Sequence, residues 1–86
     1  MNKVFSDAGW ADYVYWQTQD KKTLRRINAL LQDIERNGNQ GLGGPELLKG
    51  LSGYWSRRIN EKDRLVYKVA EGEIRIAQCR THYGDH

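Results

Sequence analysis

The sequence reads LSGYWSRRI at residues 51–59, RLVYKV at 64–69 and IRIAQCRTHY at 74–83. These runs are rich in β-branched and aromatic residues and are separated by short polar turns, so they predict three antiparallel strands. The first turn spans residues 60–63. The second centres on residues 71–72, where a glycine supplies the positive φ that a tight hairpin requires. This stretch therefore predicts an antiparallel sheet in the C-terminal half of the chain.

The cations of this stretch recur at alternate positions, and alternate residues of a strand share one face. The residues that we assign to one face are Tyr54, Ser56 and Arg58, then Arg64, Val66 and Lys68, then Gln78, Arg80 and His82. The residues that we assign to the core face are Trp55, Ile59, Leu65, Tyr67 and Val69. The first face would be basic, with a histidine and a tyrosine among its arginines.

The third strand does not alternate cleanly. Ile74 and Ile76 lie on the opposite face from Ala77 and Cys79 if the strand is regular. Either both faces of its first half are covered, or a β-bulge interrupts the alternation.

Length and composition indicate one globular domain over residues 1–86, with 38% hydrophobic and 29% charged residues. No apolar run approaches the ~18 residues of a transmembrane helix, and the start, MNKVFS, lacks the apolar core of a signal peptide. We therefore expect a cytoplasmic protein that does not bind membranes. A single cysteine, Cys79, excludes an internal disulfide and agrees with a reducing compartment.

The net charge of +3 lies entirely in the predicted sheet. Residues 1–46 hold six Lys or Arg and six Asp or Glu, whereas residues 47–86 hold eight and five. Such an excess favours a polyanionic partner such as nucleic acid, and by itself it is equally consistent with chance.

The N-terminal half predicts a short strand over residues 2–5 and two helices. Ser6 and Asp20 are N-cap residues that precede helices over residues 7–17 and 21–37, and Gly38 ends the second helix. The inner face that we assign to the first helix is Trp10, Tyr13, Val14 and Gln17, with Trp16 nearby, an aromatic core stripe rather than a ligand site. The apolar stripe of the second helix is Leu24, Ile27, Leu30, Leu31 and Ile34, and its outward residues are Arg25, Arg26, Asp33 and Glu35. Together these elements predict an α+β domain in which an N-terminal strand and an αα-hairpin pack on a mainly antiparallel sheet.

Residues 37–45 are rich in glycine and predict a loop. A phosphate-binding loop is excluded, because the loop follows a helix and has no G-K-[ST] motif. Residues 45–49 predict one helical turn with Pro45 at its first position, which would place Glu46 and Lys49 on one face.

Two constellations could carry chemistry. Cys79, His82 and His86 have metal-like spacing, but a structural zinc site needs four ligands, so we predict no metal site.

The second set is Glu46, Arg58, Arg64 and His82. A carboxylate, a histidine and one or two arginines suffice to cleave RNA without a metal or cofactor, since the 2′-OH can attack the phosphorus itself. By spacing alone, surface salt bridges are the preferred explanation of the same four residues.

Three motifs, in the same order, resemble the YoeB toxins of the RelE/ParE superfamily. They are WADYVYW at residues 10–16, LSGYWSRRI with DRLVY at residues 51–67, and CRTHY at residues 79–83. The resemblance covers the chain from residue 4 to residue 83 and implies a small RelE-like, microbial-RNase-type domain.

The resemblance also implies an activity, partners and roles for six residues. It implies the toxin of a type II toxin–antitoxin system, an mRNA endoribonuclease that acts in the ribosomal A site, in contact with ribosomal RNA, and so inhibits translation. A YefM-like antitoxin would silence it, and a homodimer is left open. The implied roles are general base for Glu46, general acid for His82, phosphate stabilisation for Arg64, and support from Lys49, Arg58 and Tyr83.

Two other classes of function stay open from the sequence. One is a non-catalytic toxin of the same fold that acts on gyrase, and the other is an RNA-binding module that uses the basic sheet face. Neither needs both Glu46 and His82, so the presence of the pair favours the nuclease.

Overall fold

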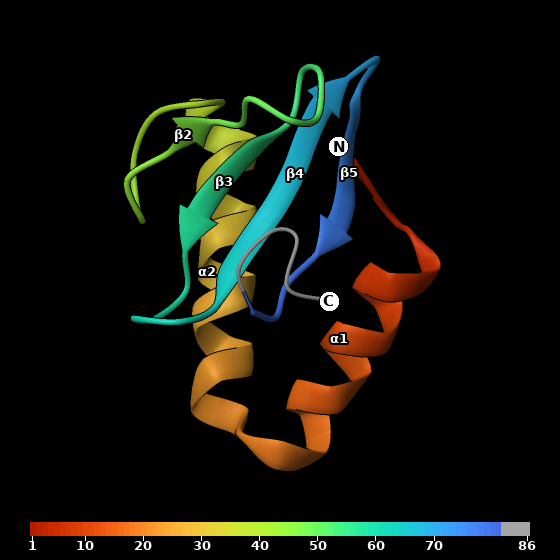
Figure 1. Cartoon of the computed structure of the whole chain (residues 1–86), viewed down its shortest axis with the longest axis vertical. Coiled ribbons are helices and arrows are strands. Elements are labelled where there is room, and N and C mark those ends of the chain that lie inside the picture. The colour runs from red at the N-terminus through yellow and green to blue at the C-terminus, as the bar shows by residue number, and fades with distance from the viewer. Residues whose placement is uncertain (82–86) are drawn as a thin grey trace.

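The computed structural model describes residues 1–81, which fold into two helices on one five-stranded sheet (Figure 1). The elements are β1 (Asn2–Phe5), α1 (Asp7–Gln19), α2 (Lys21–Asn37), β2 (Glu46–Leu47), β3 (Trp55–Arg58), β4 (Arg64–Ala70) and β5 (Glu73–Gln78). The strand order is β1-β5-β4-β3-β2, and only the β1–β5 pair is parallel. In the view of Figure 1, α2 runs behind β3 and β4. This is the α+β arrangement that the sequence predicts.

Both helices begin at the predicted capping residues. Ser6 Oγ accepts a hydrogen bond from the backbone N–H of Gly9 at 2.9 Å. Asp20 accepts from the backbone N–H groups of Lys22 and Thr23, which satisfies two donors that the first turn of α2 leaves free. At 13 and 17 residues, α1 and α2 are the helices of residues 1–81, and neither is long and apolar enough to cross a membrane.

The inner face of α1 differs from the predicted one. Trp10 is 53% exposed and Val14 is 40% exposed, whereas Gly9, Asp12 and Trp16 are buried. The reason is the close approach of α1 to β5: a Cβ at Gly9 would lie 2.6 Å from the carbonyl oxygen of Ile76. The helix therefore turns its smallest residue toward the strand. Trp10, Val14 and Gln17 were wrongly assigned to the inner face, whereas Tyr13 packs against the core as a partly buried residue.

The main core lies between α2 and the sheet, as the periodicity of α2 predicts. Its buried side chains include Ile27, Leu30, Leu31 and Ile34 of α2, with Leu65 and Tyr67 of β4 and Ile74 and Ile76 of β5. Trp55 and Val69 pack against this cluster as partly buried residues, and Ile59 belongs to it. The predicted core face of the sheet is thus confirmed.

A β-bulge resolves the irregular alternation of β5. Tyr67 pairs with Ile76 and Val66 pairs with Gln78, so Ala77 has no partner of its own on β4. The extra residue keeps Ile74 and Ile76 on the helix side and moves Gln78 to the other face. The strand ends at Gln78, so the prediction of a strand over residues 74–83 is wrong for the described residues that follow Gln78.

Residues 46 and 47 form β2 rather than the predicted helical turn. Glu46 pairs with Ser56, and Leu47 pairs with Trp55. Pairing along β3 supplies backbone hydrogen bonds to this segment, and an isolated turn of helix would leave most of those groups without partners.

Candidate active site

The sheet has an open face, which we define as the face opposite α2. Cross-strand partners lie side by side on one face of a sheet. Glu46 pairs with Ser56, Ser56 with Val66, and Val66 with Gln78, so these four residues form one row across the open face. Arg58 and Arg64 pair with each other two residues further along. The structure therefore brings Glu46, Arg58 and Arg64 to the same face in adjacent rows.

The two arginines of the open face stand directly opposite each other. Residues in this relation have Cβ atoms about 5 Å apart, and like charges so placed destabilise a sheet. Arg58 is exposed and Arg64 is half-buried. The Nε of Arg64 is buried and has no hydrogen-bond partner among residues 1–81. An anion bound between the two guanidinium groups would offset their repulsion and satisfy this donor.

The middle of the row that begins with Glu46 is buried and uncharged. Ser56 and Gln78 are each 6% exposed, and Val66 is fully buried. At the far end of the open face, Lys68 Nζ lies 5.9 Å from the ring centroid of Tyr54. Glu46 is exposed on the short edge strand, so its carboxylate is accessible to a bound substrate.

Lys49 lies past the end of β2, in the exposed turn that leads back to β3. Because β2 is a strand, the helical spacing that was predicted to align Lys49 with Glu46 does not apply. Leu48 and Tyr54 close this turn through a 2.9 Å backbone hydrogen bond. Lys49 therefore belongs to the rim beside the open face.

The C-terminal part of the predicted basic face is arranged differently. The guanidinium carbon of Arg80 lies 3.7 Å from the ring centroid of Tyr15 on α1, so Arg80 stacks on the helix layer and is not part of the open face. This corrects the sequence assignment, and the cause is the bulge and the end of β5 before residue 80. His82, Tyr83 and His86 lie outside the described residues.

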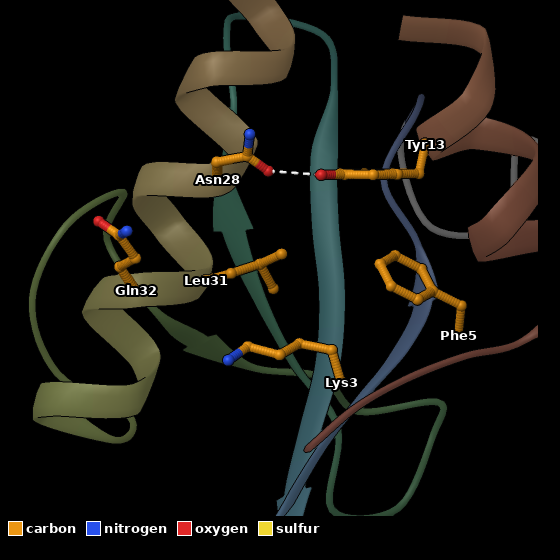
Figure 2. A pocket seen from close by; sticks show the side chains of 6 residues that line it. All are labelled: Lys3, Phe5, Tyr13, Asn28, Leu31 and Gln32. Carbon is orange, nitrogen blue, oxygen red and sulfur yellow. Dashed lines mark hydrogen bonds between the residues drawn. The ribbon is translucent and has the colours of Figure 1, made fainter. Parts of the chain in front are cut away.

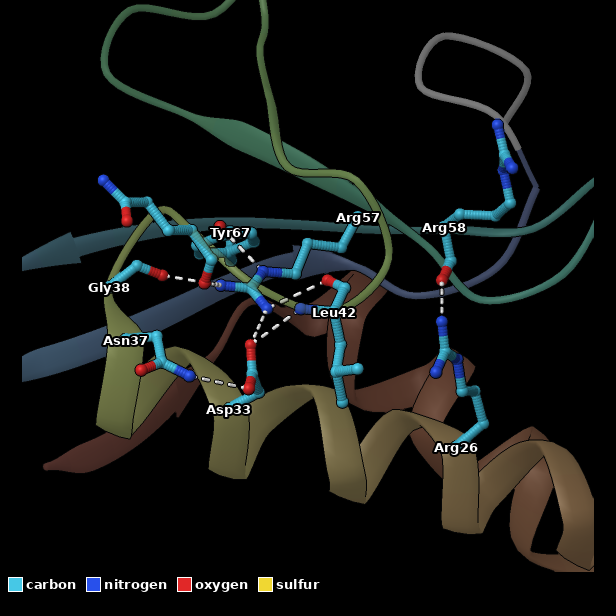
Figure 3. A network of polar contacts seen from close by, with 9 residues as sticks. Arg26, Asp33, Asn37, Gly38, Leu42, Arg57, Arg58 and Tyr67 are labelled. Carbon is cyan, nitrogen blue, oxygen red and sulfur yellow. Dashed lines mark hydrogen bonds and ion pairs between the residues drawn. The ribbon is translucent and has the colours of Figure 1, made fainter.

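A buried arginine that the sequence analysis did not assign organises the loop before Glu46 (Figure 3). Arg57 has no exposed surface, and all five of its guanidinium N–H donors have acceptors. The acceptors are Tyr67 Oη, Asp33 Oδ2 and the backbone oxygens of Gly38, Gln40 and Leu42. Asp33 therefore faces inward, which corrects its assignment to the solvent side of α2.

The signal for this network was present in the alternation of β3. Arg57 lies between Trp55 and Ile59 on the core face, and a buried guanidinium requires a carboxylate and further acceptors. Asp33 supplies the carboxylate, and the loop carbonyls supply the rest. The next residue, Arg58, donates its backbone N–H to the carbonyl of Gly43 at 2.8 Å. The loop is thus hydrogen-bonded to β3 as far as Gly43, two residues before Pro45. These bonds fix the position from which the chain enters β2 at Glu46.

The pKa values of Asp33 and Cys79 differ from the usual values of these groups. The hydrogen bond from Arg57 and the one from the backbone N–H of Leu42 hold the pKa of Asp33 below its usual 3.8. Burial raises the pKa of the Cys79 thiol to about 12, so this side chain is a protonated core residue at neutral pH. Within residues 1–81, no three His, Cys, Asp or Glu side chains are grouped so that they could hold a metal ion.

A separate pocket lies on the helix side of the molecule (Figure 2). It has a volume of about 450 Å³ and is lined by Lys3, Phe5, Tyr13, Asn28, Leu31 and Gln32. Tyr13 Oη donates to Asn28 Oδ1 at 2.7 Å across it. None of the residues predicted to act on a substrate lines this pocket, so the open face remains the candidate active site.

Comparison with known proteins identifies the family of this chain. A family model described as the YoeB-like toxin of bacterial type II toxin–antitoxin systems matches residues 5–83. This chain belongs to the YoeB-like toxins. A relative named Toxin YoeB, from Streptomyces coelicolor, is 51% identical over 84 residues, which cover 96% of this chain and 100% of that protein.

Solved structures of YoeB toxins have the same fold. A YoeB/ParE toxin from Agrobacterium tumefaciens superposes with a TM-score of 0.93 at 42% identity, covering 96% of this chain and 100% of that one. YoeB from Staphylococcus aureus is known as a dimer, with a TM-score of 0.91, and in a YoeB–YefM complex, with a TM-score of 0.90. Both are 49% identical and cover 96% of this chain and 98% of the other. The resemblance and the fold that the sequence motifs predicted are confirmed.

Proposed function

We propose that this YoeB-like toxin is a metal-independent endoribonuclease that cleaves mRNA in the ribosomal A site and thereby stops translation. The observation that carries the proposal is the placement of Glu46, Arg58 and Arg64 in adjacent rows of one sheet face, on which Glu46 and Arg58 are exposed. A base and two cations are then available to the same phosphodiester. The family supports this proposal through the toxins to which the chain is similar.

The reaction would proceed by attack of the RNA on itself. Glu46 takes the proton of the 2′-OH, the 2′-oxygen forms a bond to phosphorus, and the bond from phosphorus to the 5′-oxygen breaks. His82 gives a proton to the departing 5′-oxygen. The products are a 2′,3′-cyclic phosphate and a free 5′-hydroxyl, so neither water nor a cofactor is consumed.

Charge stabilisation would come from the paired arginines. Negative charge grows on the non-bridging oxygens as the five-coordinate phosphorus forms, and fixed cations stabilise that state more than the ground state. Arg64 is the primary candidate because its buried Nε has no acceptor within residues 1–81. Arg58 stands opposite it, and Lys49 and Tyr83 would bind the neighbouring nucleotide.

The partners follow from the same face. Ribosomal RNA and mRNA would bind the basic open face, and a YefM-like antitoxin would cover it when the toxin is silenced. A YoeB–YefM complex is known for the Staphylococcus aureus relative, as is a YoeB dimer. We therefore include a homodimer among the assemblies of this chain.

The deciding experiment maps mRNA ends after induction. Expression of the chain in a bacterial host, followed by primer extension on several messages, should reveal new 5′ ends within translated codons. A gyrase-directed toxin would instead cause DNA damage without such ends. An RNA-binding module would produce neither, and either of these results would overturn the nuclease assignment.

A further inference from the structure

Thr81 has a backbone conformation that threonine rarely adopts. Its φ is +63°, in the left-handed region, where the β-branched side chain clashes with the backbone. Residues are held in such conformations only where the surrounding structure determines them, and they gather at functional sites. The position is notable because the next residue in the chain is His82.

Both backbone polar groups of Thr81 are bound by the segment that joins β3 to β4. The N–H of Thr81 donates to Asp63 Oδ1 at 2.7 Å. The carbonyl of Thr81 accepts from the backbone N–H of Arg64 at 3.1 Å. Gln78 Nε2 also donates to this carbonyl, at 3.3 Å, and to the carbonyl of Arg80 at 3.1 Å. The turn after β5 is therefore held by hydrogen bonds from three residues, Asp63, Arg64 and Gln78.

Asp63 is itself rigidly placed. It is 1% exposed, and its second carboxylate oxygen accepts from Asn60 Nδ2 at 2.9 Å. Its backbone N–H donates to Asn60 Oδ1 at 2.8 Å, and its carbonyl accepts from the N–H of Ile59 at 3.0 Å. A buried carboxylate with two fixed donors has little conformational freedom. The position of the β3–β4 turn therefore determines where the backbone of Thr81 lies.

We propose that Asp63 is a positioning residue for the active site. Its carboxylate holds Thr81 in the left-handed conformation, and this fixes the direction in which the chain leaves toward His82. Asp63 directly precedes Arg64, so one side chain ties the phosphate-binding arginine to the segment that supplies the general acid. This role rests on the proposed function, in which Arg64 and His82 act on the same phosphate.

The competing interpretation is that Asp63 only stabilises the turn. Glycine distinguishes the two, because glycine adopts positive φ without steric cost. In an Asp63→Ala background, Thr81→Gly should restore access to the left-handed conformation, although the lost hydrogen bonds stay lost. Thr81→Ala removes a similar side chain without granting this freedom, so it is the matched control.

The test combines single-turnover cleavage of mRNA on programmed ribosomes with NMR of the free toxin. Asp63→Ala should slow cleavage roughly tenfold to a hundredfold with little change in KM, since a misplacement of about 1 Å can cost a hundredfold. Glu61→Ala removes the same charge from an exposed position in the same turn and should cleave at the wild-type rate. Adding Thr81→Gly to Asp63→Ala should recover part of the rate, and adding Thr81→Ala should not.

The NMR measurement needs no RNA and reports only on the contact between Asp63 and Thr81. Asp63→Ala should move the Cα and Cβ shifts of Thr81 away from left-handed values and displace the signals of His82, and Thr81→Gly should return the His82 signals toward their wild-type positions. Unchanged Thr81 shifts, or equal rescue by Thr81→Ala, would overturn the proposal. If Asp63→Ala does not fold, Asp63→Asn, which keeps one acceptor oxygen, replaces it in every arm. If instead His82→Gln cleaves normally, the proposed function fails while the NMR result on Asp63 stands.

Discussion

Arg57 on β3 and Asp33 on α2 form an ion pair inside the molecule, with Nη1 of the arginine 2.5 Å from Oδ2 of the aspartate. The arginine side chain is fully buried and the aspartate is 14% exposed. The pair joins the helix layer to the sheet. Three further N–H groups of Arg57 donate to carbonyls of the loop that precedes Glu46, and its Nε–H donates to Tyr67 Oη. Stability and the position of the proposed base thus depend on one side chain.

Replacing Arg57 by methionine should destabilise the fold strongly. Methionine fills much of the volume but leaves three loop carbonyls without the donor that Arg57 supplies, while Asp33 keeps its hydrogen bonds from Asn37 and Leu42. A buried acceptor left without its donor costs about 1–3 kcal/mol. Urea unfolding followed by tryptophan fluorescence measures the loss. Arg25→Met, at an exposed position on α2, is the control and should stay within about 0.5 kcal/mol of the wild type. Equal stability of the two variants would contradict the role assigned to the network.

The contribution of Asp33 should disappear in acid. Hydrogen bonds from Arg57 and Leu42 lower the pKa of Asp33 in the folded state from its usual 3.8, so the unfolded chain takes up the proton first as pH falls. The resulting stability is complete above the unfolded pKa and is lost as pH falls through the folded pKa. We therefore expect Asp33→Asn to be less stable than the wild type at neutral pH, by an amount that shrinks below pH 3.8. A gap that is the same at both pH values would argue against this linkage.

Glu46→Gln and His82→Gln should each suppress growth arrest after induction. Each change keeps a polar side chain and removes the group that transfers a proton, which is worth about 10²- to 10⁴-fold in rate. Glu46 is exposed, so its replacement should leave thermal unfolding nearly unchanged. The measurement is the rate of mRNA cleavage on programmed ribosomes. Full toxicity of two folded variants would refute the acid–base mechanism.

Cleavage by the free toxin should not require a metal ion. Excess chelator should leave the cleavage of a short RNA unchanged, because proton transfer and fixed cations supply the catalysis. Ribosome assays are unsuitable here, since the ribosome itself needs magnesium. Elemental analysis of the purified chain should find no stoichiometric zinc. One tightly bound equivalent would restore the alternative in which Cys79, His82 and His86 bind a metal.

An acidic antitoxin segment should bind across the open face and quench cleavage. Such a segment would be disordered when free and would fold on the arginines, so association should be faster at low salt. Co-expression with a neighbouring acidic reading frame, co-purification and NMR mapping would test this. Shifts at Arg58 and Arg64 are expected. If only the signals of α2 respond, the antitoxin does not silence the toxin by covering its active face.

Local patterns were enough to predict much of the fold. The alternation of β3 and β4 identified their core face, and the 3.6-residue period of α2 identified its buried stripe, because burial repeats with the geometry of each element. The capping side chains Ser6 and Asp20 act on residues two or three positions away. For the same reason the motifs sufficed to assign the family, and the placement of Arg58 opposite Arg64 follows from the short turn between their strands.

Tertiary contacts decided what these patterns could not. Asp12 faces the core because its carboxylate accepts from the backbone N–H of Cys79, 67 residues away. Glu46 lies on a strand because residues 55 and 56 offer it a partner, and Arg57 is buried because Asp33 and a distant loop satisfy it. Each outcome depends on a hydrogen bond between segments far apart in sequence. Such bonds follow no local period, so they exist only once the whole chain has packed.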